Sequence, residues 1–226
     1  MARGILIAGN KSSLFSALCV EAAKRVEKYA VALIPQEQTQ KPVPNRLTDP
    51  LYVSNRQHVL DWNPASPVSA KTMILSVLNK MEHIDDAILV CVPPAYRKTT
   101  EEFSTAEIDR LVDYNIKGWF FLVRELTAVF TAHKRGTLSL VLPELNAGSV
   151  DETPDFIGPA AVAAFRSFAQ GIILSSHSTP YSAMGFSLPE PGGENAFAAF
   201  VFKNMEEGKR NSGKWIKYGK LGFFGR

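Results

Sequence analysis

The segment Thr105–Pro143 constrains the fold of this chain more than any other, because it predicts a long helix that leads directly into a buried strand. Its apolar side chains recur at steps of three and four residues: Ile108, Leu111, Val112, Trp119, Leu122, Val123, Leu126 and Phe130. That spacing is typical of one apolar helical face, so we expect a single helix over residues 105–133. Gly136 then ends the helix, and the apolar run that follows predicts a strand ending at Pro143.

Asn115 is the polar residue that interrupts this apolar face. The stretch Asp113–Leu122, in which Asn115 and Gly118 form an Asn-x-x-Gly step, resembles the asparagine helix of the short-chain dehydrogenase/reductase family. In that family the helix lies against a parallel sheet beside the nicotinamide site, and its asparagine holds an active-site water. The resemblance therefore implies a catalytic role for Asn115. A polar residue at a helix packing contact explains it equally well.

The order of the predicted elements along the chain also resembles that family. Strands are predicted at 5–8, 31–34, 58–63, 86–92, 137–142, 181–186 and 215–219, and helices at 14–28, 69–83, 105–133, 160–176 and 194–207. The nearly unbroken apolar run 86–92 is typical of a central strand in a parallel sheet covered on both faces. We therefore predict a single domain over residues 1–226, a doubly wound α/β fold of the Rossmann-like type with a mainly parallel sheet of about seven strands.

Composition excludes several classes of function. The 226 residues are 46% apolar and 21% charged, and the formal net charge of +3 is spread over several elements. A nucleic-acid-binding surface needs a dense basic patch, so we expect no nucleic-acid partner. Cys19 and Cys91 form no disulfide or metal-binding spacing, and we expect no metal site. The chain begins without a signal-peptide core and has no run of membrane-spanning length, so we expect a cytoplasmic protein with no membrane partner.

The turn after the first strand is where this kind of fold binds a dinucleotide, because amides at the helix N-terminus face the pyrophosphate. The resemblance implies three glycines there, but only Gly9 is kept, with Ser13 and Phe15 at the other two places. Asp61 falls where the family often has an acid that contacts the adenine, although a cap at the strand end ahead of Pro64 explains it equally. Gly9, Ser13 and Asp61 are the candidate cofactor-binding residues. We expect no NAD(P) binding or weak binding.

The Ala-rich helix 160–176 resembles the catalytic helix of the family, which begins Tyr-x-x-x-Lys. Alignment on its alanines puts Asp155 at the tyrosine place and Pro159 at the lysine place. Registers shifted by one residue put Pro154 or Phe156, and Gly158 or Ala160, at these places instead. The serine expected after the preceding strand falls near Leu142 and Pro143. Asn115 is therefore the one catalytic position of the family that the chain retains.

Other titratable residues could replace the missing catalytic acid, namely Tyr96, Tyr181 and His177. Cys91, at the end of the fourth predicted strand, is interpreted as a buried and inert thiol because no cation or base lies near it in the sequence. Nothing in the spacing of these residues favours a catalytic role over a structural one.

Two hypotheses of function follow. The chain is a divergent, catalytically silent relative that serves as a binding or assembly module, or it is an NAD(P)-dependent oxidoreductase acting on a small carbonyl or alcohol with a non-standard acid/base. We also predict a homo-oligomer formed through helices 105–133 and 160–176, which carry more apolar surface than one sheet contact uses. The side chains that suggest this surplus are Phe120, Phe121, Val129 and Phe165.

Overall fold

The computed structural model of the protein describes residues 3–25, 28–34, 57–145 and 155–219. Its strands are β1 (Gly4–Gly9), β2 (Lys28–Leu33), β3 (Gln57–Asp61), β4 (Asp86–Val90), β5 (Thr137–Pro143), β6 (Ser182–Leu188) and β7 (Lys214–Lys217). They form one seven-stranded sheet in the order β3-β2-β1-β4-β5-β6-β7, and every pair of neighbours is parallel. The predicted doubly wound fold with about seven strands is confirmed. The extent of a single domain over residues 1–226 stays a prediction.

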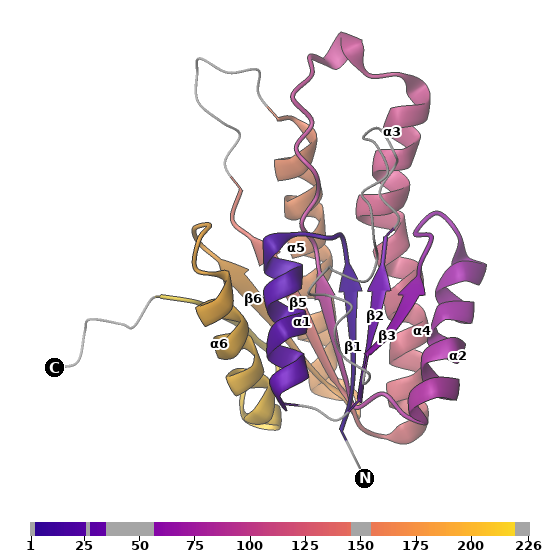
Figure 1. Ribbon diagram of the computed structural model, residues 1–226, viewed down its shortest axis with the longest axis vertical. Helices are drawn as coiled ribbons and strands as arrows, with labels where there is room; N and C mark the ends of the chain where they lie inside the picture. The colour runs from indigo at the N-terminus through magenta and orange to yellow at the C-terminus, as the bar shows by residue number, and fades with distance from the viewer. Residues whose placement is uncertain (1–2, 26–27, 35–56, 146–154, 220–226) are drawn as a thin grey trace, which may run out of the picture.

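The helices are α1 (Ser13–Arg25), α2 (Pro67–Met81), α3 (Thr105–Val112), α4 (Gly118–His133), α5 (Ile157–Ser175) and α6 (Glu194–Glu206). Short helical turns are η2 (Thr100–Glu102), η3 (Asp113–Lys117), η4 (Ser176–Ser178) and η5 (Gly208–Arg210). Helices α1 and α6 pack on one face of the sheet, and α2, α4 and α5 pack on the other (Figure 1). All residues of β1 and β4 are buried, because apolar side chains of both faces meet a helical layer.

The predicted helix over 105–133 is interrupted by a wide turn. Residues 113–117 form the π-helical turn η3 between α3 and α4, with Asn115 as its buried residue. A π-turn holds one extra residue relative to the α-helical repeat. The apolar spacing alone does not reveal this insertion, because the buried residues before and after it still fall on one face.

Helix α5 is apolar on more than the side that meets the sheet. The window Ile157–Ser178 is long and apolar enough to cross a membrane by length and composition, with a mean hydropathy of 1.4, and 33% of it is buried. In this fold the helix is the crossover between β5 and β6, which pair directly along seven residue positions. It therefore covers the sheet, and its remaining apolar surface faces outward.

Because all seven strands are parallel, their carboxyl ends meet at one edge of the sheet. The chain winds outward in opposite directions from β1 and β4, which are neighbours. Ligands of open α/β sheets bind at such a switch point, in the crevice outside the carboxyl ends of the strands. This edge between β1 and β4 is therefore the place to look for a functional site.

Candidate functional site

Gly9 is the last residue of β1 and lies beside Val90, the last residue of β4. A Cβ atom on Gly9 would lie 2.5 Å from the Val90 carbonyl oxygen and 3.2 Å from Cδ2 of Phe15. Neither contact leaves room for a side chain. The close packing of β1, β4 and α1 is therefore sufficient to explain the glycine at this position.

Phe15 fills the space below the turn. Its side chain is 0% exposed and packs in the core between α1 and the sheet, together with Leu18 and Ile7. The Phe15 amide donates to Oγ of Ser12 at 3.1 Å, so Ser12 caps the first turn of α1. A glycine at this place would let the helix pack closely on the strand. The Phe15 ring fills that space instead.

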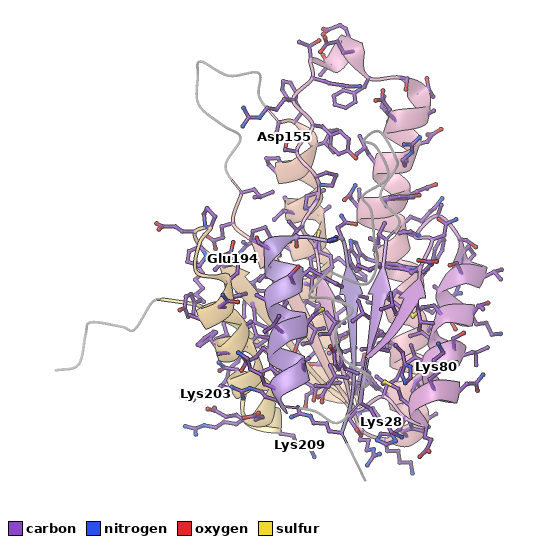
Figure 2. All side chains as sticks on the ribbon, viewed as in Figure 1. Lys28, Lys80, Asp155, Glu194, Lys203 and Lys209 are labelled. Carbon is purple, nitrogen blue, oxygen red and sulfur yellow. The ribbon has the colours of Figure 1, made fainter. Side chains whose placement is uncertain are left out.

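Ser13, the first residue of α1, is joined to the first residue of α6. Its hydroxyl donates to Oε1 of Glu194 at 3.0 Å. Figure 2 shows Glu194 at the end of α6 that lies beside the start of α1. Backbone amides of Glu194 itself and of Gly192, and then the Ser13 hydroxyl, lower the pKa of the Glu194 carboxyl. A carboxylate of the chain itself therefore lies at the helix N-terminus where this kind of fold holds a pyrophosphate.

The mouth of the switch point is bridged by Asn10. Its side-chain amide, directly after β1, donates to the carbonyl oxygen of Val92 at 3.2 Å, two residues after the end of β4. Pro93, which has no amide hydrogen, follows Val92 and is buried. This hydrogen bond ties together the two segments between which a bound dinucleotide would lie.

Asp61 lies at the same edge of the sheet as Gly9. Gly9 pairs with Leu33, and Leu33 pairs with Asp61, so the three residues form one row across β1, β2 and β3. Two strand spacings place Gly9 and Asp61 roughly 10 Å apart. Asp61 is exposed, and the next residue, Trp62, is fully buried. The fold thus brings together the candidate residues Gly9, Ser13 and Asp61 along one edge, and their role in cofactor binding stays a prediction.

Asn115 is buried and its side chain turns back onto its own helix. Its Nδ2 donates to the carbonyl oxygen of Leu111 at 3.0 Å. A π-turn widens the helix and leaves its carbonyl groups less well aligned for ordinary helical bonds. The side chain thus supports the η3 turn. The catalytic role that the resemblance implies stays a prediction.

The start of α5 carries a helix cap where the family has its catalytic tyrosine. Asp155 Oδ1 accepts from the amides of Ile157 at 3.1 Å and Gly158 at 2.9 Å, so Asp155 satisfies two of the free donors of α5. Asp155 lies at the top of that helix in Figure 2. Of the alternative registers, Phe156 is half exposed and Pro154 lies outside the described residues. None of the described residues at the tyrosine and lysine places is a phenol or an amine.

Two of the possible replacement acids lie at the wrong edge of the sheet. Tyr181 and His177 precede β6, and the residues before a parallel strand lie at the amino edge, away from Gly9 and Asn10. Tyr96, after β4, is on the carboxyl side and packs on Phe103 with ring centroids 6.4 Å apart. Cys91 is buried below Trp119, and burial raises the pKa of its thiol, so the predicted inert thiol fits its position.

Sequence reasoning missed two functional features of this edge. The Asp155 cap had a local signal, since Asp directly before an apolar helical run is typical of a helix start. The Ser13–Glu194 contact had none, because the two residues are 181 positions apart in the chain. Among the described residues, no group of three or more His, Cys, Asp and Glu side chains is placed to hold a metal ion.

Comparison with known proteins gives relatives in sequence and in structure. No model of a known protein family matches the chain. An uncharacterized protein of Treponema pallidum (strain Nichols) is 25% identical over 175 residues, which cover 76% of this chain and 77% of that protein. This likeness carries no assigned activity.

Solved structures of the same architecture are much more distant in sequence. An NADH-dependent reductase in complex with NAD has a TM-score of 0.71 at 14% identity, covering 95% of this chain and 94% of its own. Serine dehydrogenase from Escherichia coli has a TM-score of 0.71 at 16% identity, with 95% and 96% covered. A variant of a Serratia marcescens short-chain dehydrogenase/reductase has a TM-score of 0.66 at 12% identity, with 95% of each chain covered. This chain therefore has the fold of the short-chain dehydrogenases/reductases.

Proposed function

We propose that this protein uses the short-chain dehydrogenase/reductase fold as a catalytically silent binding or assembly module, with a degenerate dinucleotide site. The observation that carries this proposal is the Glu194 carboxylate, which accepts a hydrogen bond from Ser13 at the N-terminus of α1. A dinucleotide would bring its pyrophosphate to the amides of this same helix N-terminus. The residues at this turn do not fit an NAD(P) cofactor.

The repulsion between two such anions is large enough to matter. Two unit charges about 4 Å apart repel by about 1 kcal/mol in water and about 4 kcal/mol at the effective dielectric constant near a protein surface. That range corresponds to a roughly 5- to 1000-fold loss of affinity. The buried Phe15 ring and the Asn10–Val92 bridge add to this loss, because both must shift before a dinucleotide can approach β1 closely.

The start of α5 supports the silent interpretation independently. Proton transfer to a substrate oxygen needs a group with a suitable pKa within hydrogen-bond reach of that oxygen. Asp155 is engaged with the first amides of α5, and neither Pro159 nor Ala160 can lower the pKa of a neighbouring acid. The chain thus lacks both the phosphate-binding glycines and the catalytic acid/base of the family, and each loss alone would impair catalysis.

Titration calorimetry with NADH and NADPH tests the cofactor part. The unmodified protein is expected to show no binding in the micromolar range, and Glu194→Gln is expected to raise the affinity at least about fivefold. Glu190→Gln, a matched change in the exposed loop before α6, is expected to have no effect. Micromolar binding by the unmodified protein contradicts the proposal. An equal effect of both variants contradicts the role of Glu194.

One observation favours the alternative, an NAD(P)-dependent oxidoreductase with a non-standard acid. Gly9 and Asp61 lie in one row at the carboxyl edge, as a dinucleotide site requires, and Tyr96 is on the same side of the sheet. Steady hydride transfer to a small carbonyl compound, abolished by Asn115→Ala and Tyr96→Phe, establishes this alternative in place of the silent module.

We also propose that the protein assembles through α3, α4 and α5. Ile108, Val112, Ile116 and Phe120 are exposed and follow one another at four-residue steps. A step of four residues is longer than one turn of α-helix, which takes 3.6 residues. The same step is shorter than one turn of the wider η3. The two drifts compensate, so the π-turn keeps this apolar stripe on one side of the helix.

Helix α5 continues the apolar stripe. Phe120 packs on Phe168 of α5 with ring centroids 4.2 Å apart, and Leu174 is 73% exposed. The prediction that Phe165 adds to this surplus surface is wrong, because its side chain is buried against Trp119 inside the fold. A second copy related by a two-fold axis presents the same apolar residues and is the partner that fits them.

Sedimentation velocity between about 1 and 100 µM tests the assembly. Phe120 is 54% exposed, so about 100 Å² of each ring remains to be buried, which is worth about 2.5 kcal/mol per copy. Phe120→Glu is therefore expected to give a monomer. Val68→Glu, at a 71% exposed position on α2, is the matched control and should leave the dimer intact. An unmodified protein that stays monomeric as its concentration rises refutes the assembly.

A further inference from the structure

The free edge of the sheet at β7 opens into a groove of about 630 Å³. Its floor is the whole strand Lys214–Lys217, and its walls come from α5, with Arg166 and Gln170, and from α6, with Asn204. In the part of the chain that the structure describes, no strand pairs with the outer side of β7. An edge strand of this kind presents unpaired amides and carbonyl groups to which another extended chain can add.

The four residues of β7 alternate between the two faces of the sheet. Trp215 packs with the core on the α5 side, and its indole N–H donates to Oγ of Ser187 at 2.7 Å. Ile216 packs with the core on the α6 side. By alternation Lys214 shares the side of Ile216 and Lys217 shares the side of Trp215. Each side of the edge therefore offers one apolar residue and one exposed lysine.

The groove is cationic, with few acids in contact with its walls. The Arg166 guanidinium lies over the Trp215 ring, 5.1 Å from its centroid, and is 3.5 Å from a carboxylate oxygen of Glu144. The Lys214 ammonium donates to the carbonyl oxygen of Arg210 at 2.8 Å, a contact that leaves its charge uncompensated. The Glu207 carboxylate accepts a hydrogen bond from the side-chain amide of Asn211 at 3.1 Å.

This charge pattern argues against pairing of β7 with its own copy. Such pairing would bring two edges of the same charge together, each with the exposed residues Lys214 and Lys217. Like charges brought close together repel. A strand with acidic side chains beside apolar ones meets the same edge with complementary charge on both faces.

We propose that β7 and its groove bind an extended acidic segment of another protein by strand addition. Main-chain hydrogen bonds to the outer edge of β7 hold the segment. Its acidic side chains pair with Lys214 on one face and with Lys217 and Arg166 on the other, and its apolar side chains contact Ile216 and Trp215. The site is separate from the β1–β4 edge and from the apolar stripe on α3 and α4.

Fluorescence anisotropy with a labelled seven-residue peptide, Thr-Glu-Val-Ile-Glu-Val-Thr, whose two acids lie on opposite faces of an extended strand, tests the proposal on the full chain at low and high salt. Binding is expected to be at least tenfold stronger than for the same peptide with lysine in place of each acid, and to weaken as salt rises. A peptide with proline at its centre keeps the charge but loses a main-chain donor, and is expected to bind about tenfold more weakly. Equal binding of the acidic and lysine peptides, or of the proline peptide, overturns the proposal.

Two lysine pairs give matched variants of equal charge change. Lys214→Glu with Lys217→Glu is expected to reverse the preference toward the lysine peptide. Lys203→Glu with Lys209→Glu, on the same side of the molecule but outside the groove, should change the affinity less than twofold (Figure 2). Equal losses in both pairs overturn the proposal. Hydrogen exchange of the unmodified protein tests the site without any variant. The acidic peptide is expected to slow the exchange of the β7 amides, and unchanged exchange overturns the proposal.

Discussion

Restoring the phosphate glycine of the dinucleotide-binding turn should strongly destabilise this protein rather than create a cofactor site. Phe15 stands at the third glycine place, but its side chain is 0% exposed and lies in the core with Ile5, Ile7 and Leu18. Phe→Ala substitutions in cores cost about 3–5 kcal/mol. Glycine in a helix costs about 1 kcal/mol more. Phe15→Gly is therefore expected to lose roughly 4–6 kcal/mol, out of a total stability of about 5–15 kcal/mol for a typical domain.

Urea unfolding followed by tryptophan fluorescence measures the cost of losing the ring in Phe15→Ala, about 3–5 kcal/mol. With a slope of about 2–3 kcal/mol per molar, Phe15→Ala should lower the midpoint by about 1–2 M, at an unchanged slope. The matched control is Phe156→Ala, since Phe156 is 47% exposed at the start of α5. It should lose no more than about 1 kcal/mol. If both variants lose the same amount, Phe15 does not fill the core below the turn, and its ring does not keep a dinucleotide out.

Three further predictions concern single side chains. Asn115→Ala removes the buried hydrogen bond to the Leu111 carbonyl and should destabilise the protein by about 1–3 kcal/mol in the same urea assay; a loss below about 0.5 kcal/mol contradicts a structural role for this amide. Asp155→Ala removes the cap of α5 and should cost about 1 kcal/mol, whereas Asp155→Asn, which keeps an acceptor, should cost less. The Lys98 ammonium, followed by the amide and hydroxyl of the α3 N-cap, lowers the pKa of Glu107 from 4.5 to about 2. Because this pKa is lower in the folded state, the stabilisation is complete above about pH 4.5 and lost as the pH falls toward 2, and Glu107→Gln should remove that pH dependence of amide exchange in α3.

The sequence by itself determined the order and type of the elements. Helices follow from apolar spacings of three to four residues and strands from spacings of two, which are local properties. The seven strands and five helices could therefore be placed from apolar patterns and from residues such as Gly136, with α3 and α4 predicted as one helix. The same local reasoning placed Gly9 and Asp61 at strand ends. Because parallel strands end at one edge, both residues lie at the carboxyl edge of the sheet.

Tertiary structure decided what those residues do. The packing of Phe15 against Gly9 and β4 shows that the ring at the third glycine place is part of the core. The π-turn at Asn115 follows from hydrogen bonds that shift by one residue within an otherwise regular apolar pattern. Ser13 meets Glu194 only because α1 and α6 pack side by side on one face of the sheet. Contacts between residues so distant in the chain depend on how whole elements pack, and no local spacing encodes them.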